Sequence, residues 1–162
     1  MGKPLGVGIV GVGNISSQYL ANIPRLSNLK LIGISDLIKE RQEAIANSHN
    51  VKSFDGDQIF SDPDVDVILN LTLPQSHAEV NLKALNNGKH VYLEKPFALS
   101  VAEGAPIIDL AARKGLRIGC APDTFLGTGI QSSKFMIESG AIGSPFAATA
   151  SWSAPGHELW HP

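Results

Sequence analysis

The sequence has little cysteine and no block of charge of one sign. Its 162 residues include a single cysteine, Cys120, which excludes an internal disulfide and is compatible with a reducing cytoplasm. The formal net charge is -2, from 13 lysines and arginines against 15 aspartates and glutamates. Nucleic-acid binding requires a basic face, so this balance argues against a nucleic-acid partner.

Long apolar runs, internal repeats and low-complexity segments are also missing. The longest apolar runs are strand-sized, well short of the ~20 residues that span a bilayer. The first residues, Met1-Gly2-Lys3-Pro4, lack a signal-peptide pattern. We therefore expect a cytoplasmic protein with no membrane partner. Small and apolar neighbours favour a buried strand cysteine at Cys120 over a nucleophile.

Strand-like and helix-like segments alternate along the chain. After an apolar run that begins at Leu5, strands are expected at residues 29–35, 52–54, 65–73, 90–93 and 116–121. Between and after them, helices are expected at residues 15–21, 37–48, 57–60, 75–87 and 132–139. Such alternation with short connections predicts an α/β fold, a Rossmann-type doubly wound parallel sheet.

One further helix is expected where Ser100-Val101-Ala102-Glu103 has the form of a capping box. Pro106 follows inside the helical pattern, which runs to Gly115. Because an interior proline costs a helix about 3 kcal/mol, the helix either bends at Pro106 or begins later than the capping box indicates.

The last part of the chain has a different pattern. Residues 146–152 alternate apolar with polar side chains, which predicts the first strand of another sheet. A lone strand cannot form a stable sheet. We therefore expect one domain in residues 1–143 and the beginning of a second, truncated α+β domain in residues 144–162.

A glycine turn follows the first apolar run. Gly11 and Gly13 fit the pattern G-x-G-x-x-G, and Ser16 stands at the third glycine position, where a small residue still allows close packing. Free N–H groups at the start of a helix, with the positive end of its dipole, can hold a phosphate. Such a turn is also often only a turn, so the pattern alone leaves nucleotide binding open.

Asp36 ends the second expected strand, where an acid can accept hydrogen bonds from a ribose diol. The alternative is a helix N-cap. An acid here would repel a 2′-phosphate, and Leu37 with Ile38 could pack on adenine, which favours NAD. Lys39 and Arg41 lie nearby, so NADP stays open as a cofactor.

Glu94-Lys95-Pro96 follows the fifth expected strand at the predicted ligand edge of the sheet. A lysine that is partly desolvated there could exchange protons with a substrate, and Glu94 could orient it. The alternative is a solvated pair on a loop. Pro96 would fix the turn, with a cis or a trans peptide bond.

His157-Glu158-Leu159-Trp160-His161 matches the zinc-protease pattern H-E-x-x-H. That chemistry needs both histidines on one helical face and a third ligand. Pro162 follows directly, and the residue before a proline is biased away from helix. We therefore expect no metal site.

Together these segments resemble the glucose-fructose oxidoreductase, inositol dehydrogenase and MocA family of NAD(P)-dependent oxidoreductases. The resemblance covers nearly the whole chain. It is carried by residues 7–16, by Asp36, by Leu73-Pro74-Gln75-Ser76-His77 and by residues 88–96.

The resemblance implies a hydride transfer between nicotinamide and a hydroxyl carbon of a small-molecule sugar or cyclitol. It implies these cofactor-binding residues: Gly11, Gly13, Asn14 and Ile15 at the pyrophosphate, Asp36 and Leu37 at the adenosine, Leu73, Pro74 and His77 in the cleft, and Glu94, Lys95 and Pro96 near the nicotinamide. Lys95 would be catalytic by hydrogen-bonding the reacting hydroxyl. The resemblance also implies that residues 1–143 form a dinucleotide-binding domain and that residues 144–162 begin a domain for substrate binding and oligomerisation. A homo-oligomer is implied for the full-length protein.

Two departures from the family concern the substrate. Relatives often carry an asparagine or tyrosine with an arginine and a proline after the sixth strand, where this chain has Asp123-Thr124-Phe125-Leu126-Gly127. Asp123 and Trp160 are therefore the candidate substrate residues. The histidine that partners the lysine lies in the family's second domain, beyond this sequence. A non-catalytic nucleotide-binding module and an S-adenosylmethionine enzyme stay as alternatives.

Overall fold

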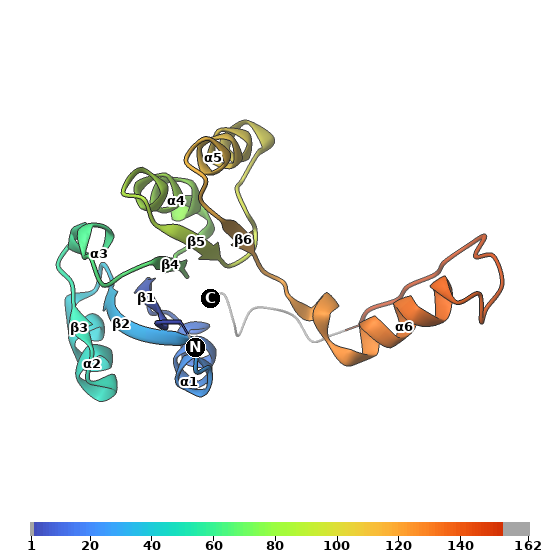
Figure 1. Cartoon of the computed structure of the whole chain (residues 1–162), viewed down its shortest axis with the longest axis horizontal. Coiled ribbons are helices and arrows are strands. Elements are labelled where there is room, and N and C mark those ends of the chain that lie inside the picture. Colours follow the sequence, from blue (N-terminus) through green and yellow to red (C-terminus); the bar gives the residue numbers. More distant parts are fainter. Residues whose placement is uncertain (1, 154–162) are drawn as a thin grey trace. The chain divides into compact units, whose positions relative to one another are not determined.

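The structure is a computed structural model that describes residues 2–153. The chain divides into two compact units, Met1–Pro122 and Asp123–Pro162, and each is described by itself. Figure 1 labels the elements of both units.

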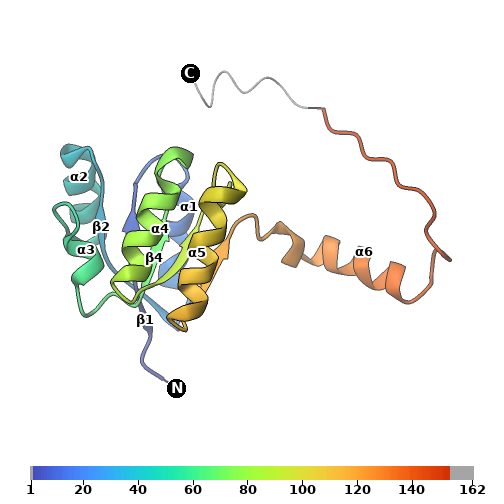
Figure 2. The same cartoon turned by 90° about the horizontal axis from the view of Figure 1, so that it is seen from above.

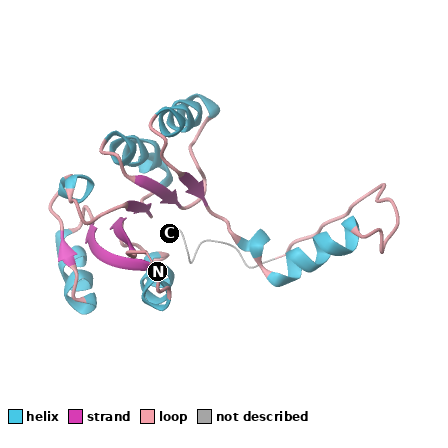
Figure 3. Cartoon of the chain, viewed as in Figure 1, coloured by secondary structure: helices cyan, strands magenta, loops and turns pink. Residues whose placement is uncertain are grey.

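The first unit contains one sheet of six parallel strands (Figure 3). Across the sheet the order is β3-β2-β1-β4-β5-β6. The strands are β1 Leu5–Val10, β2 Leu29–Ser35, β3 Lys52–Ser53, β4 Val67–Asn70, β5 His90–Leu93 and β6 Ile118–Cys120. The Rossmann-type doubly wound sheet predicted from the sequence is thereby confirmed.

Helices cover both faces of the sheet, with α4 and α5 side by side on one face and α1 on the other (Figures 1 and 2). The helical elements of this unit are α1 Ser16–Asn22, η1 Ile23–Arg25, α2 Lys39–His49, α3 Gln58–Ser61, η2 Pro74–Ser76, α4 His77–Asn86 and α5 Val101–Arg113. Between residues 2 and 153, no helix is long and apolar enough to cross a bilayer.

Two hydrophobic cores fill the space between sheet and helices. Neighbouring residues of β4 belong to different cores, because Ile68 packs with α4 and α5 residues such as Leu85 and Ile107, whereas Leu69 packs with Leu20 of α1. A strand buried on both faces is near-continuously apolar, as the sequence of this segment predicted. The two cores fix the sheet rigidly beneath the loops that follow its strands.

Helix α5 begins at the predicted capping box and runs through Pro106. The Ser100 hydroxyl accepts the Glu103 N–H at 3.2 Å, and the Glu103 carboxylate accepts the Leu99 N–H, also at 3.2 Å. The alternative that the helix begins after Pro106 is wrong. The cap satisfies N–H groups of the first turn and so supports a helix that already includes the proline.

The second unit contains η3 Thr124–Leu126 and α6 Thr128–Glu138. The expected strand at residues 146–152 is wrong, because the structure shows no strand there. An alternating pattern yields a strand only where a partner strand accepts its hydrogen bonds, and the described residues supply none for this segment. The boundary at residue 143 stays a prediction.

Candidate functional site

The candidate site lies at the carboxyl edge of the sheet, where the chain order reverses between β1 and β4. In doubly wound sheets, ligands bind in the crevice outside such a switch point. The ends of β4 and β1 are joined here by the Leu71 N–H, which donates to the Val10 carbonyl at 2.9 Å, and the ends of β1 and β2 by the Gly11 N–H, which donates to the Ser35 carbonyl at 2.8 Å. The predicted glycine turn therefore lies where the fold places ligands.

Gly11 and Gly13 of this turn differ in what surrounds them. Gly11 has a φ of +87°, and a Cβ added to it would lie 2.9 Å from backbone atoms of Leu71 and Thr72. At Gly13 an added Cβ would meet nothing within 4 Å. The fold thus requires glycine at position 11, whereas position 13 faces open space that a ligand can enter.

The backbone N–H groups after this turn are available to a ligand. In the part of the chain that the structure describes, the N–H groups of Gly13, Asn14 and Ile15 donate to no acceptor. Ser16, the predicted small residue at the third glycine position, is buried, and its hydroxyl donates to the Gly13 carbonyl at 2.6 Å. Three consecutive free donors before α1 form the arrangement that holds a phosphate.

Asp36 follows β2 and lies beside the turn. Its carboxylate accepts the Val12 N–H at 2.7 Å, the Ile38 N–H at 2.8 Å and the Arg41 guanidinium at 2.7 and 2.9 Å. Burial acts to raise the pKa of Asp36, but the hydrogen bonds from Val12, Ile38 and Arg41 outweigh it and hold the pKa below its ordinary value of 3.8. The ionised Asp36 carboxylate thus stabilises the glycine turn through its hydrogen bond with Val12, and it is also a candidate ribose ligand.

The low pKa of Asp36 predicts a pH-dependent contribution to stability. A carboxyl group whose pKa is depressed by folding stabilises the fold above its ordinary pKa, and this contribution is lost as the pH falls through the folded value. Asp36→Asn should therefore lower the free energy of unfolding by about 1–3 kcal/mol at pH 7. Urea unfolding should show that the difference in unfolding free energy between the native chain and Asp36→Asn shrinks below about pH 4. A difference that does not depend on pH would contradict a stabilising role of the ionised carboxylate.

Three predicted cofactor residues present apolar side chains to solvent at this edge. Ile15, Leu37 and Leu73 are all exposed, and Leu37 is fully so at 102%. Pro74 follows as the first residue of η2. Exposed apolar side chains around a polar crevice are typical of ligand sites. Their positions agree with packing on flat rings, although their contacts with a cofactor stay a prediction.

His77 begins α4, but its side chain is completely buried. The ring Nδ1 lies 2.6 Å from the Pro96 carbonyl oxygen, and Nε2 lies 3.1 Å from the Thr72 carbonyl oxygen. The buried ring thus ties the loops after β4 and β5 together. The predicted place of His77 in the cofactor cleft stays a prediction.

A residue of α1 that sequence reasoning missed forms a hydrogen bond with the Glu94 side chain. The Tyr19 hydroxyl of α1 donates to Glu94 Oε1 at 2.7 Å, while Oε2 accepts the N–H of Lys95 at 3.2 Å. The predicted orientation of the Lys95 ammonium by Glu94 is not what the structure shows. No local pattern around Tyr19 indicates this role, since the contact joins residues 75 positions apart.

Lys95 is exposed on a turn that is fixed from several sides. The Lys95–Pro96 peptide bond is cis. Among the described residues no carboxylate pairs with the Lys95 ammonium, so the group is available to a ligand. Cys120 lies nearby in β6, half-buried, and burial together with the charge of Glu94 raises the pKa of its thiol. A raised pKa agrees with the expected absence of nucleophilic chemistry at Cys120.

Other sequence-predicted residues lie elsewhere. Asp123 is the first residue of the second unit and precedes η3, and its substrate role stays a prediction. Trp160 and the H-E-x-x-H segment at residues 157–161 lie outside the described residues. Within residues 2–153, no group of three or more histidine, cysteine, aspartate or glutamate residues could hold a metal ion.

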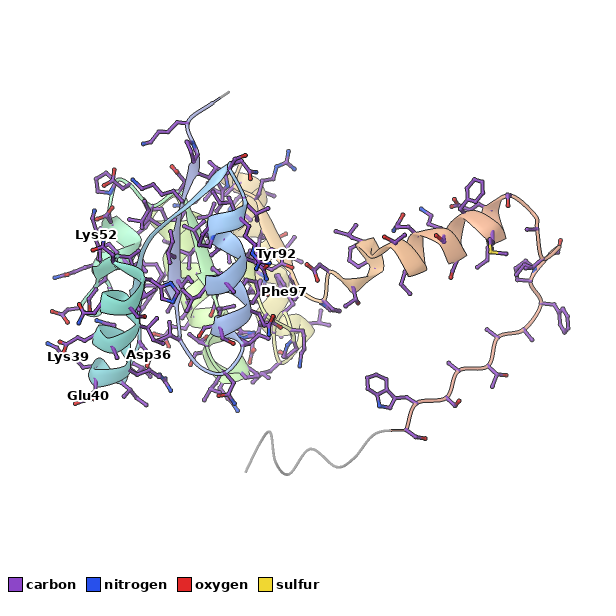
Figure 4. The ribbon with its side chains drawn as sticks, turned by 90° about the horizontal axis from the view of Figure 1, so that it is seen from below. Asp36, Lys39, Glu40, Lys52, Tyr92 and Phe97 are labelled. Carbon is purple, nitrogen blue, oxygen red and sulfur yellow. The ribbon has the colours of Figure 1, made fainter. Side chains whose placement is uncertain are left out.

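A groove of about 530 Å³ lies between α1 and α2, beside the glycine turn. Its lining includes Gly13 and Asn14 from the turn, Ser17 from α1, and Arg41 and Ile45 from α2. Figure 4 shows Asp36 near the amino end of α2, where Lys39 and Glu40 lie. The groove extends the candidate site from the glycine turn along α1 and α2 to Arg41, the partner of Asp36.

Comparison with known families gives a match over most of the chain. The sequence profile of the Gfo/Idh/MocA family, described as an oxidoreductase family with an NAD-binding Rossmann fold, matches residues 5–121. Among curated proteins, the oxidoreductase YrbE of Bacillus subtilis is 28% identical over 147 residues, which cover 90% of this chain and 43% of that protein. Inositol 2-dehydrogenase of Salmonella typhimurium is 29% identical, covering 87% and 44%.

Solved structures resemble the same part of the chain. An NAD-binding protein from Listeria innocua superposes with a TM-score of 0.79 at 29% identity, covering 87% of this chain and 42% of that one. Biliverdin reductase from Synechocystis, solved with biliverdin and NADP+, gives a TM-score of 0.73 at 28% identity, covering 83% and 44%. The chain thus spans less than half the length of the relatives it matches.

Proposed function

Because the chain belongs to the oxidoreductase family with an NAD-binding Rossmann fold, we propose that it is the cofactor-binding part of a sugar or cyclitol dehydrogenase. The observation that carries the proposal is the set of three free N–H groups beside Gly13, at the switch point of the sheet. The inositol 2-dehydrogenases among the relatives support a cyclitol or a similar polyol as substrate. The chain's own substrate is part of the proposal.

The residues present fit a nicotinamide dinucleotide. Gly13, Asn14 and Ile15 would hold the pyrophosphate through their backbone N–H groups, since Gly13 leaves the approach open. Asp36 would accept the adenosine ribose hydroxyls, with Leu37 beside the adenine. Leu73 and Pro74 would line the cleft toward the turn that carries Glu94, Lys95 and Pro96.

The bound cofactor supplies hydride chemistry, and the protein supplies alignment and proton transfer. Lys95 is exposed at the carboxyl edge, and its amine would take the proton of a substrate hydroxyl that is oxidised, while its ammonium form would hydrogen-bond and protonate the oxygen in the reverse direction. Tyr19 and His77 keep the backbone of that turn in place from two sides. This division of labour supports a dehydrogenase over a module that only binds nucleotides.

Titration of the purified chain with NADH tests the proposal. We expect a saturable change in NADH fluorescence, with a dissociation constant below the millimolar range. S-adenosylmethionine in excess should not displace NADH. No saturable change at millimolar NADH, or displacement by S-adenosylmethionine, would refute the assigned cofactor.

The second unit supports a further part of the proposal. Several apolar side chains of η3 and α6 are exposed, among them Phe125, Leu126, Ile130, Phe135 and Met136. Exposed apolar surface of this kind marks an interaction site. The relatives are more than twice as long as the matched part of this chain. We propose that the exposed apolar side chains of η3 and α6 pack against a substrate-binding half, and that the full-length protein is a homo-oligomer.

A further inference from the structure

The Glu94 side chain lies on the face of the sheet that α1 covers. The Glu94 N–H donates to the Asn70 carbonyl at 3.1 Å, so the strand pairing of β5 continues through this residue. Leu93 belongs to the core that contains α4 and α5 residues, whereas Tyr92 packs against the core that contains α1 residues. Because side chains alternate along a strand, Glu94 lies on the same face as Tyr92 and meets Tyr19 of α1.

Tyr19 offers Glu94 a fixed hydrogen-bond donor. Its ring is half-buried and packs against the core on the α1 side. Its hydroxyl donates to Glu94 Oε1 at 2.7 Å, while Glu94 Oε2 accepts the Lys95 N–H at 3.2 Å. The carboxylate is thus bound to a helix at one oxygen and to the backbone at the other, and these two contacts set its direction.

Glu94 and Lys95 are adjacent and opposite in charge, yet within residues 2–153 their side chains form no ion pair with each other. Lys95 is exposed, so its ammonium can reach a neighbouring carboxylate that is not held elsewhere. Without the Tyr19 hydroxyl, the Glu94 carboxylate is free to turn toward that ammonium. A nearby opposite charge favours the charged form of a lysine and so lowers the fraction of free amine.

We propose that Tyr19 is a positioning residue whose hydroxyl keeps the Lys95 amine available by holding the Glu94 carboxylate away from it. A group that takes the proton of a substrate hydroxyl must be the free amine, because an ammonium has no acceptor site. Tyr19 therefore acts on the chemistry through Glu94. The consequence for turnover rests on the proposed function, whereas the effect on the reactivity of Lys95 does not.

Tyr19→Phe tests the proposal, since it removes the hydroxyl and keeps the ring that packs in the core. Trace acetic anhydride acetylates free amines, and mass spectrometry of the digested chain gives the acetylation of Lys95 relative to Lys30, an exposed lysine at the amino end of β2. At pH 7 we expect Lys95 to react about two- to fivefold more slowly in Tyr19→Phe than in the native chain, which is the range that an exposed ion pair supplies.

Two further variants separate the ion pair from a general effect on the turn. The double variant Tyr19→Phe/Glu94→Gln has no carboxylate to release, so Lys95 should react at the native rate. Tyr92→Phe removes the other tyrosine hydroxyl of the chain and should also leave the rate unchanged. Urea unfolding checks that each variant is folded. An unchanged rate in Tyr19→Phe, or a slow rate that Glu94→Gln does not restore, would overturn the proposal.

NADH titration distinguishes failure of this inference from failure of the proposed function. If the native chain binds NADH and Tyr19→Phe leaves the Lys95 rate unchanged, the proposed function stands and the role of Tyr19 is wrong. If the native chain binds no NADH and the rate falls as expected, the proposed function fails and Tyr19 still controls Lys95. In the form of the protein that turns over substrate, Tyr19→Phe should lower kcat at pH 7 by about the same factor and leave NADH binding unchanged.

Discussion

Gly13→Ala is expected to weaken NADH binding by at least about tenfold while leaving the fold intact. An added Cβ meets no atom within 4 Å and Gly13 needs no positive φ, so the stability should change by no more than about 0.5–1 kcal/mol. The methyl group would occupy the open space at position 13, next in the chain to the free N–H groups of Asn14 and Ile15. A phosphate must approach such donors to about 2.9 Å, and the methyl group obstructs that approach.

Gly11→Ala is the matched control, because it should destabilise the fold, whereas Gly13→Ala should leave the fold intact. At a φ of +87° a side chain costs about 1–3 kcal/mol, and the added Cβ would press on the backbone of Leu71 and Thr72 at 2.9 Å. Urea unfolding should therefore show a clear loss of stability for Gly11→Ala and almost none for Gly13→Ala. If Gly13→Ala bound NADH as the native chain does, the pyrophosphate would not lie at this turn.

Much of the fold could be predicted because the signals are local. The apolar runs gave β2 and β5 with the observed bounds, 29–35 and 90–93. Strand β4 is shorter than the predicted 65–73, since the Thr72 N–H and hydroxyl turn back onto Asn70 Oδ1 at 3.2 and 2.6 Å. Apolar character continues past the point where this side-chain contact ends the strand, so the pattern alone could not place the end.

The contacts that join distant residues were beyond sequence reasoning. The position of Asp36 after a strand predicts a ligand site. Its hydrogen bond with Val12 and its ion pair with Arg41 depend on the three-dimensional fold and cannot be predicted from that position. The sequence predicts His77 at the ligand edge, and the structure shows its buried ring in contact with the Thr72 and Pro96 carbonyl oxygens. Position along the chain could predict which edge a residue lies on, and packing decided which way its side chain points.

Lys95→Ala is expected to lower kcat by about 10²–10⁴-fold in the form of the protein that turns over substrate. The proposed role is proton transfer at the reacting hydroxyl, which an alanine cannot perform. Within residues 2–153 the Lys95 ammonium has no carboxylate partner, so its removal leaves no buried charge unpaired. Stability should stay within about 0.5 kcal/mol of the native value.

Cofactor affinity distinguishes this loss from damage to the cofactor site. NADH titration of Lys95→Ala on the present chain should match the native titration, in contrast to Gly13→Ala. Lys30→Ala is the control, since Lys30 is an exposed lysine at the amino end of β2, away from the carboxyl edge. An unchanged kcat in Lys95→Ala would remove Lys95 from the chemistry. A large loss of NADH affinity would make it a cofactor ligand, because a residue that acts only on the substrate proton has no reason to alter binding of the free cofactor.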